Sequence, residues 1–179
     1  MVYILLGTGF EEMEAIAPLD LLRRADIPVQ TVGIGSKTIY GGHGIGITAD
    51  ITVEEMDLTA MEMLVLPGGL GGVASIQGNP LSMDAIRFAH ENGLLIAAIC
   101  AAPTILAALS ITDGKKAVCY PSCEDKMGAA QMENKSCTRD GNVITGTSAG
   151  CAVPFGLLLI ETLRGPEAAK AIERQIVIR

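Results

Sequence analysis

The most restrictive feature of this chain is a regular alternation of short apolar runs with segments of helical periodicity. Four of the apolar runs end in turns of small residues, at 7–9, 67–69, 100–102 and 146–150. Such alternation is typical of parallel strands joined by crossover helices. The sequence therefore predicts an α/β fold, with a doubly wound, mostly parallel sheet and helices on both of its faces.

The same pattern predicts where the individual elements lie. Strands are predicted at Val2–Leu6, 29–34, Met63–Leu66, 94–99 and 142–145. Helices are predicted at 11–24, 80–92, 103–109, 150–163 and 167–174. Pro18 should start or kink the first helix, because proline lacks the amide that a helix interior needs. The Gly-rich stretch 41–50 should form a small hairpin or edge strand, and 119–135 should be irregular. With no repeat or linker to divide it, the chain should form one domain, residues 1–179.

Composition argues against several classes of partner. The 179 residues include 13 Lys and Arg against 20 Asp and Glu, which gives a net charge of −7, and only 3% are aromatic. Nucleic acid would need a basic patch or stacking side chains, and the chain offers neither. No apolar run reaches the roughly 18 residues of a membrane span, and the N-terminal run lacks the basic segment of a signal peptide. The expectation is a cytoplasmic protein that binds neither nucleic acid nor membranes.

The five cysteines are an odd number, and their spacing does not suggest a disulfide framework, so reduced thiols are expected. Cys119 and Cys123 have no second pair and no nearby histidine, which argues against a zinc site. Together with Cys137 and Cys151, they are interpreted as small buried or partly buried residues. No metal site is predicted.

The four small-residue turns should meet at one edge of the sheet, because the crevice of such folds lies beyond the carboxyl ends of the strands. The turn 7–9 resembles the start of a dinucleotide motif, but Glu12 stands where the third glycine belongs, and the neighbouring carboxylates would repel a pyrophosphate. The turn 146–150 has the G-x-S-x-G pattern of serine hydrolases, yet His43 and His90 both precede it, against the chain order of that fold. No cofactor is therefore predicted, and a close-packed turn is favoured at 146–150.

The turn after the strand 94–99 contains the sharpest chemical signal. An apolar strand runs directly into Cys100, which is followed by two alanines and then Pro103 at a helix start. Small neighbours allow a sharp strand-to-helix turn that projects one side chain over the sheet. The unpaired N–H groups of a first helical turn lower a cysteine pKa from about 8.5 into a range of roughly 3.5–7.5. A buried, unreactive cysteine is the competing interpretation, and the pattern alone favours neither.

Two further segments could complete a site around Cys100. The turn of Gly68 and Gly69 fits either a tight turn or a set of backbone N–H donors for an oxyanion. Of the three carboxylates at the start of the first helix, Glu14 could lean toward the thiol instead of capping the helix. A carboxyl beside a thiolate tends to have a raised pKa, which would make Glu14 a proton donor.

These motifs resemble those of the ThiJ/PfpI superfamily, and within it the branch of the parkinsonism-associated protein DJ-one and its bacterial relatives. The resemblance spans essentially the whole chain. It rests on five segments in the right order, at 9–14, 20–24, 65–69, 97–103 and 125–127. The resemblance implies a flavodoxin-like, class I glutamine amidotransferase-like sandwich, usually a homodimer. It also implies a reactive cysteine with a neighbouring glutamate and no cofactor.

The resemblance also implies roles for individual residues. Cys100 matches the nucleophile and Glu14 the acid/base carboxylate. Gly68 and Gly69, together with Ala101, match the turns that bind the oxyanion and the substrate. The protease-like branch has His where Ala101 stands, which argues against a Cys-His peptidase.

Three more residues match positions near the dimer interface or the site. Arg24 matches an interface arginine, although a cation at a helix end is also explained by the helix dipole. His43 lies in a loop where relatives carry Arg or His, although loop histidines are commonly just solvated. Tyr120 replaces the histidine that the family often has before a proline; it can donate a hydrogen bond but cannot act as a base near neutral pH.

The family's described activities imply two functions for this chain. In the first, a cofactor-free enzyme acts on reactive 2-oxoaldehydes or glycated proteins, as a glyoxalase or deglycase, through Cys100 and Glu14. In the second, the same cysteine serves an oxidation sensor or chaperone and becomes a sulfinate held by Glu14. The sequence does not separate them, because both need a thiolate beside a carboxyl. A homodimer is expected, with the first helix and the loop 41–46 in its interface.

Overall fold

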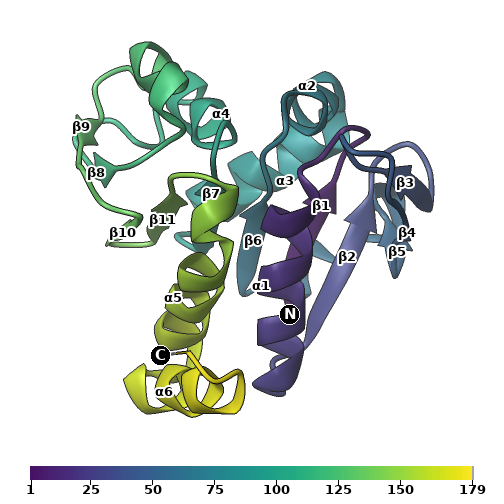
Figure 1. The fold of residues 1–179 in the computed structure, drawn as a ribbon. Helices are drawn as coiled ribbons and strands as arrows, with labels where there is room; N and C mark the ends of the chain where they lie inside the picture. Colours follow the sequence, from purple (N-terminus) through teal and green to yellow (C-terminus); the bar gives the residue numbers. More distant parts are fainter. Residues whose placement is uncertain (179) are drawn as a thin grey trace.

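A seven-stranded sheet forms the middle layer of the molecule, in the order β10-β11-β7-β6-β1-β2-β5. The computed structural model describes residues 1–178 (Figure 1). The strands of this sheet are β1 Val2–Leu6, β2 Val29–Gly33, β5 Ile51–Thr52, β6 Met63–Leu66, β7 Leu95–Ile99, β10 Cys137–Asp140 and β11 Val143–Gly146. All neighbours pair in parallel except β10 and β11, which are antiparallel. The predicted flavodoxin-like, mostly parallel sheet is confirmed.

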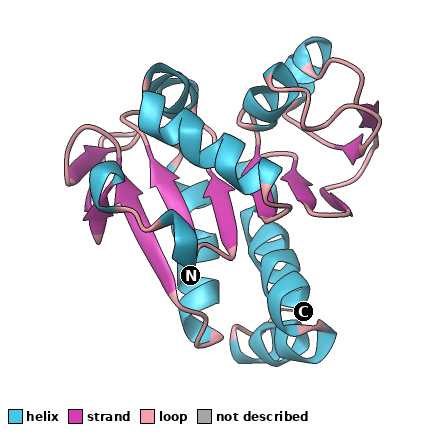
Figure 2. Cartoon of the chain, turned by 180° about the vertical axis from the view of Figure 1, so that it is seen from behind, coloured by secondary structure: helices cyan, strands magenta, loops and turns pink. Residues whose placement is uncertain are grey.

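Within residues 1–178, six α-helices cover the two faces of the sheet. They are α1 Glu12–Arg24, α2 Leu70–Gly78, α3 Pro80–Glu91, α4 Pro103–Ala108, α5 Ala152–Arg164 and α6 Pro166–Gln175. Helices α1, α5 and α6 share one apolar cluster with the sheet, and α2, α3 and α4 share the other. Figure 1 shows α1 and α5 side by side on the near face, and Figure 2 shows the opposite face from behind. Because both faces are covered, the central strands β1 and β6 are buried throughout, which explains their unbroken apolar sequences.

The predicted hairpin within 41–50 is present, but its strands lie on either side of the glycines. Strand β3 Thr38–Tyr40 pairs with β4 Gly46–Thr48 in an antiparallel ladder. The region 119–135 contains more regular structure than predicted, with a 3₁₀ helix at Pro121–Lys126 (η3). Its last part also supplies β9 Gln131–Met132, which pairs with β8 Lys116–Ala117. Strand β10 was not predicted either, because three of its four residues are polar, which suits a loop as well as an edge strand.

Pro18 neither starts nor ends the first helix, which continues through it from Glu12 to Arg24. The contact with α5 accounts for this, because a Cβ at Gly156 would lie only 3.1 Å from the Pro18 Cα. The missing side chain at Gly156 lets the two helices approach closely at the proline. Tertiary packing thus offsets the intrahelical hydrogen bond that proline cannot make.

Helix α2 was not predicted, because the glycines within 67–72 indicated either a tight turn or a set of backbone N–H donors and not a helix. Within α2, a Cβ at Gly72 would lie 2.7 Å from the Phe10 Cα, and one at Gly71 would lie 2.9 Å from the Thr8 carbonyl oxygen. These glycines therefore allow the start of α2 to pack directly on the loop that follows β1. Close approach, and not a turn conformation, explains these two glycines.

No helix within residues 1–178 is long and apolar enough to cross a membrane. All five cysteines are free; Cys119 and Cys123 are buried, whereas Cys137 and Cys151 are partly buried, as predicted.

Candidate active site

The strand β7 ends in a sharp turn at Cys100, directly before the start of α4. Cys100 has a positive φ of 65°, which costs a non-glycine residue roughly 1–3 kcal/mol and needs support from its surroundings. Two backbone hydrogen bonds supply it: the Cys100 N–H donates to the Gly146 carbonyl at 2.9 Å, and the Cys100 carbonyl accepts from the Tyr120 N–H at 2.8 Å. The predicted strand-to-helix elbow is present, and β11 and the segment at Tyr120 hold it in place.

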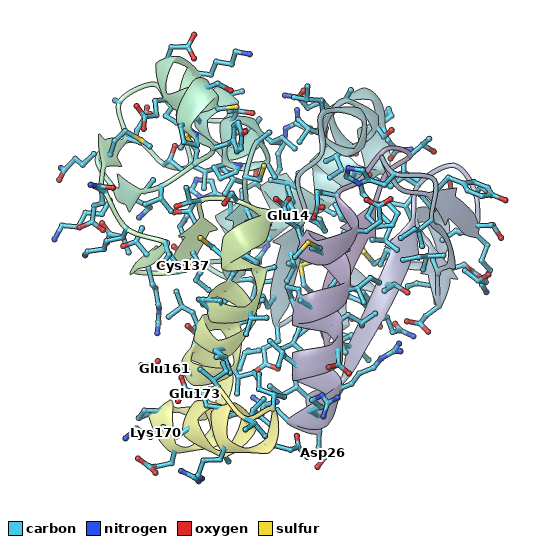
Figure 3. All side chains as sticks on the ribbon, viewed as in Figure 1. Glu14, Asp26, Cys137, Glu161, Lys170 and Glu173 are labelled. Carbon is cyan, nitrogen blue, oxygen red and sulfur yellow. The ribbon has the colours of Figure 1, made fainter. Side chains whose placement is uncertain are left out.

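Glu14 lies in the first turn of α1 and is completely buried (Figure 3). Its Oε2 accepts a hydrogen bond from the Gly68 N–H at 2.8 Å, whereas its buried Oε1 has no standard hydrogen-bond partner among residues 1–178. Burial raises the pKa of Glu14 to about 7, against the opposing effect of hydrogen bonding with Cys100 and the Gly68 N–H. Glu14 therefore holds a proton far more readily than an exposed carboxyl does, as predicted.

Gly68 forms the point of contact between Glu14 and Cys100. A Cβ built on Gly68 would lie 2.5 Å from the Glu14 Oε2 and 2.7 Å from the Cys100 Cβ. No side chain fits there, so only glycine lets the backbone pass between the carboxyl and the elbow. The structure thus brings Glu14, Gly68 and Cys100 together from three elements.

Two backbone N–H groups face the thiol. Hydrogen bonds from Ala101 and Gly69 both act to lower the pKa of Cys100, which means that they stabilise negative charge at this point. Gly69 also has a positive φ of 83°, a conformation that suits glycine. These are the donors that an oxyanion beside Cys100 would need.

The net effect on the thiol is opposite to the expectation of a lowered pKa. Burial, then the charge of Glu14 and hydrogen bonding to it, raise the pKa of Cys100 to about 12. The hydrogen bonds from the Ala101 and Gly69 N–H groups lower the pKa of Cys100 by less than burial and Glu14 raise it. Because the thiol and the Glu14 carboxyl repel when both are charged, they titrate as a pair, and the first negative charge raises the pKa for loss of the second proton. After the first proton is lost, the pair holds one negative charge and one proton.

A cavity of about 260 Å³ opens onto Cys100. It is lined by Glu11, Gly69, Leu70, Cys100, Ala101, Tyr120, Ser122 and Cys123. Tyr120 and Ala101 are among these lining residues, and their roles at the site stay predictions. Leu70, Ser122 and Cys123 were not predicted; the first requires the unrecognised helix α2, and the other two lie on η3.

Arg24 and His43 do not line this cavity. Arg24 lies in the last turn of α1, where its Nε is 2.6 Å from the Asp20 carboxylate. The His43 N–H donates to the Glu12 Oε1 at 2.7 Å, and its Nδ1 lies 2.7 Å from the Oε2 of the same carboxylate. Hydrogen bonding to Glu12 raises the pKa of His43. A role of Arg24 and His43 in a dimer interface stays a prediction.

One group of metal-ligating side chains stands out within residues 1–178. Glu11, Glu12 and His43 have ligand atoms that all lie within 4.8 Å of one another. The hydrogen bonds between Glu12 and His43, and the capping bond from the Glu14 N–H to Glu11, account for this arrangement without an ion.

Comparison with known proteins agrees with this architecture. The family model described as DJ-1/PfpI family matches residues 1–162. Protein dj-1beta of Drosophila melanogaster is 34% identical over 178 residues, which cover 98% of this chain and 95% of that protein. The glutathione-independent glyoxalase DJR-1.2 of Caenorhabditis elegans is 28% identical, with coverage of 94% and 90%. The structure of oxidized DJ-1 from Toxoplasma gondii superimposes with a TM-score of 0.94 at 28% identity, with coverage of 98% and 97%. The chain therefore belongs to the DJ-1/PfpI family.

Proposed function

We propose that this chain is a cofactor-free enzyme that converts small 2-oxoaldehydes into 2-hydroxy acids, with Cys100 as nucleophile and Glu14 as acid and base. The observation that carries the proposal is the buried Glu14 carboxyl, with a pKa of about 7, next to a half-buried thiol. General acid–base groups work best when their pKa lies near the operating pH. The relative named glutathione-independent glyoxalase supports this chemistry.

The cavity favours a small, uncharged substrate. At about 260 Å³ it has room for a molecule of a few non-hydrogen atoms, and its lining residues include no cationic side chain. Two carboxyl groups, Glu11 and Glu14, lie at or beside it. An anionic substrate would meet negative charge there, so methylglyoxal fits better than a 2-oxo acid or a glycated protein segment.

The singly charged pair supplies both reactants of the first step. When the proton resides on Glu14, the Cys100 thiolate attacks the aldehyde carbon, a C–S bond forms, and the carbonyl π electrons move to oxygen. The N–H groups of Gly69 and Ala101 stabilise the developing oxyanion, and the Glu14 proton neutralises it. The product is a hemithioacetal on Cys100.

Glu14 then acts as a base. Its carboxylate removes the proton from the former aldehyde carbon, which gives an enediolate. The hydroxyl proton on that carbon moves to the neighbouring oxygen, and Glu14 returns its proton to the neighbouring carbon. The result is a 2-hydroxy thioester on Cys100. Attack by water breaks the C–S bond and releases the hydroxy acid and the thiol. One carbon is oxidised while the next is reduced, so the sequence is balanced without a cofactor.

The test is an assay of purified protein with methylglyoxal and no glutathione, in which lactate is measured directly. We expect turnover in the wild type and its loss in Cys100→Ala, because the covalent step has no nucleophile. Cys137→Ala is the matched control, since it removes another partly buried thiol outside the cavity. Absence of lactate with the wild type, or equal rates for Cys100→Ala, would refute the proposed function.

A further inference from the structure

A second cysteine, Cys123, lines the cavity of Cys100. This cavity has a volume of about 260 Å³, and Cys123 is only 5% exposed. The proposed turnover does not use it. A buried thiol that shares a small cavity with a nucleophilic cysteine is a candidate for reaction with it.

Hydrogen bonds tie the segment that carries Cys123 to the elbow. The Tyr120 N–H donates to the Cys100 carbonyl at 2.8 Å, and the Cys123 N–H donates to the Tyr120 carbonyl, also at 2.8 Å. Two backbone bonds therefore connect the two cysteines through a single residue. Cys123 lies within η3, a 3₁₀ helix whose neighbouring residues Pro121 and Ser122 are exposed. Hydrogen bonds of 3₁₀ geometry are weaker than those of an α-helix, so such a short segment can shift.

We propose that Cys123 is the resolving thiol for Cys100, so that a hydroperoxide converts the two residues into an intramolecular disulfide. This reaction needs no turnover of an aldehyde and stands independently of the proposed function. It differs from oxidation of Cys100 to a sulfinate, because a sulfenic acid condenses with a thiol where one is within reach.

The chemistry has two balanced steps. First, the Cys100 thiolate attacks a peroxide oxygen, the O–O bond breaks, and the leaving oxygen takes the Glu14 proton. The sulfur becomes a sulfenic acid, and the hydroperoxide is reduced to an alcohol, or to water when the oxidant is hydrogen peroxide. Second, the Cys123 sulfur attacks the sulfenic sulfur, an S–S bond forms, and the hydroxyl group leaves with the Cys123 proton as water.

The other thiols are placed less favourably. The Cys119 Sγ lies 3.4 Å from the Tyr120 carbonyl, and Cys119 does not line the cavity. Cys137 lines a groove beside α5 and α6, and its Sγ lies 3.9 Å from the Cys151 carbonyl. The disulfide should therefore be specific for Cys100 and Cys123, provided that η3 moves until the two Cα atoms are about 4.4–6.8 Å apart.

The experiment treats reduced wild-type protein with one equivalent of hydrogen peroxide, blocks free thiols, and analyses intact mass and peptides without reductant. We expect the loss of two hydrogens and one cross-linked peptide pair that contains Cys100 and Cys123. A reductant added before the blocking step should restore the original mass. A wild-type product with one or two added oxygens on Cys100 and no cross-link, or a cross-link that joins any other pair, would overturn the proposal.

Two variants sharpen the result. In Cys123→Ala the cross-link should be lost, and Cys100 should gain oxygen instead, as a sulfenic acid with one equivalent of peroxide and as a sulfinate with two. In Cys119→Ala, which removes the neighbouring buried thiol, the Cys100–Cys123 cross-link should persist. Persistence of a cross-link to Cys100 in Cys123→Ala would contradict the assignment. The wild-type peptide map decides the question even if a variant folds poorly.

Discussion

Two carboxyl groups near the start of α1 are both buried, yet their environments shift their pKa values in opposite directions. Burial favours the neutral form of Glu12, but hydrogen bonds from the His43 ring and backbone outweigh it and lower the pKa of Glu12. Glu14 is buried beside a thiol and accepts one standard hydrogen bond, and its pKa rises to about 7. The comparison teaches that burial alone does not set the charge of a side chain; the number and type of its hydrogen-bond donors decide it.

The two residues also face different surfaces. Glu12 lines a groove of about 560 Å³ between α1 and α5, together with the exposed side chains of Met13 and Ile16. Glu14 faces Gly68 and the elbow on the other side of the helix. Two residues of one helical turn therefore lie at two different surfaces. Substitutions of Glu12 and of Glu14 should affect the groove and the site at Cys100 separately.

The largest expected effect is on turnover. Glu14→Gln keeps a hydrogen-bond donor but cannot exchange protons, so turnover of methylglyoxal should fall by roughly 10²–10⁴-fold, the usual contribution of a general acid or base. Glu12→Gln should stay within a few-fold of wild type. The measurement is kcat without glutathione. Equal activity in the wild type and Glu14→Gln would mean that Glu14 has a purely structural role.

The pH dependence of stability should differ in sign between the two carboxyls. The folded protein holds the Glu14 proton more tightly than the unfolded chain, so this contribution is complete below the ordinary pKa of 4.5 and is lost as pH rises toward about 7. The shift corresponds to about 3 kcal/mol. Glu12 behaves oppositely, because its lowered pKa gives stability above the ordinary value that is lost as the pH falls through the folded-state value.

Urea unfolding of the wild type, Glu14→Gln and Glu12→Gln at pH 5 and pH 8 measures these two contributions. Relative to the wild type, Glu14→Gln should gain stability on going from pH 5 to pH 8. Glu12→Gln should show no such gain. Equal changes in the free energy of unfolding between pH 5 and pH 8 in all three proteins would contradict the opposite pKa shifts of Glu12 and Glu14.

A smaller effect is expected from Gly68→Ala. The added methyl group would collide with the Glu14 carboxyl and the Cys100 Cβ, so the free energy of unfolding should fall by about 1–3 kcal/mol, the usual cost of overpacking. Gly78→Ala is the matched control, because a Cβ at that position meets no atom within 4 Å. Thermal unfolding measures both. Unchanged stability of Gly68→Ala would indicate that the site tolerates a wider separation of its two groups.

The smallest effect on monomer stability is expected for a substitution on the Glu12 side of α1. We expect this side of the helix to face a second copy of the chain. Met13 is 57% exposed at the apolar groove, so Met13→Glu should weaken a homodimer and leave monomer stability almost unchanged. Leu81→Glu, at a residue 44% exposed on α3, is the control. Light scattering at micromolar concentration gives the mass. A monomeric wild type would contradict the expected homodimer.

Much of the fold and part of the site followed from local patterns. The parallel strands, the elbow at Cys100 and the small-residue turns could be predicted because strand burial and turn chemistry are encoded in neighbouring residues. Helix α2 and strand β10 could not, since glycine has a low helix propensity and a run of polar residues suits a loop as well as an edge strand. The pattern alone left Cys100 open between a nucleophile and a buried thiol, and the role of Glu14 rested more on the resemblance to the family than on spacing.

What the sequence alone determined was the type of fold, the presence of the elbow and the residue types that meet at the carboxyl edge of the sheet. Only the tertiary structure decided the charge of the site. The raised pKa values of Glu14 and Cys100 depend on burial and on mutual repulsion between residues 86 positions apart in the sequence. The position of Cys123 at the cavity also depends on the tertiary structure, because backbone hydrogen bonds through Tyr120 connect η3 to the elbow at Cys100. Electrostatic energy depends on distance and solvent access, and neither quantity exists until the chain has packed.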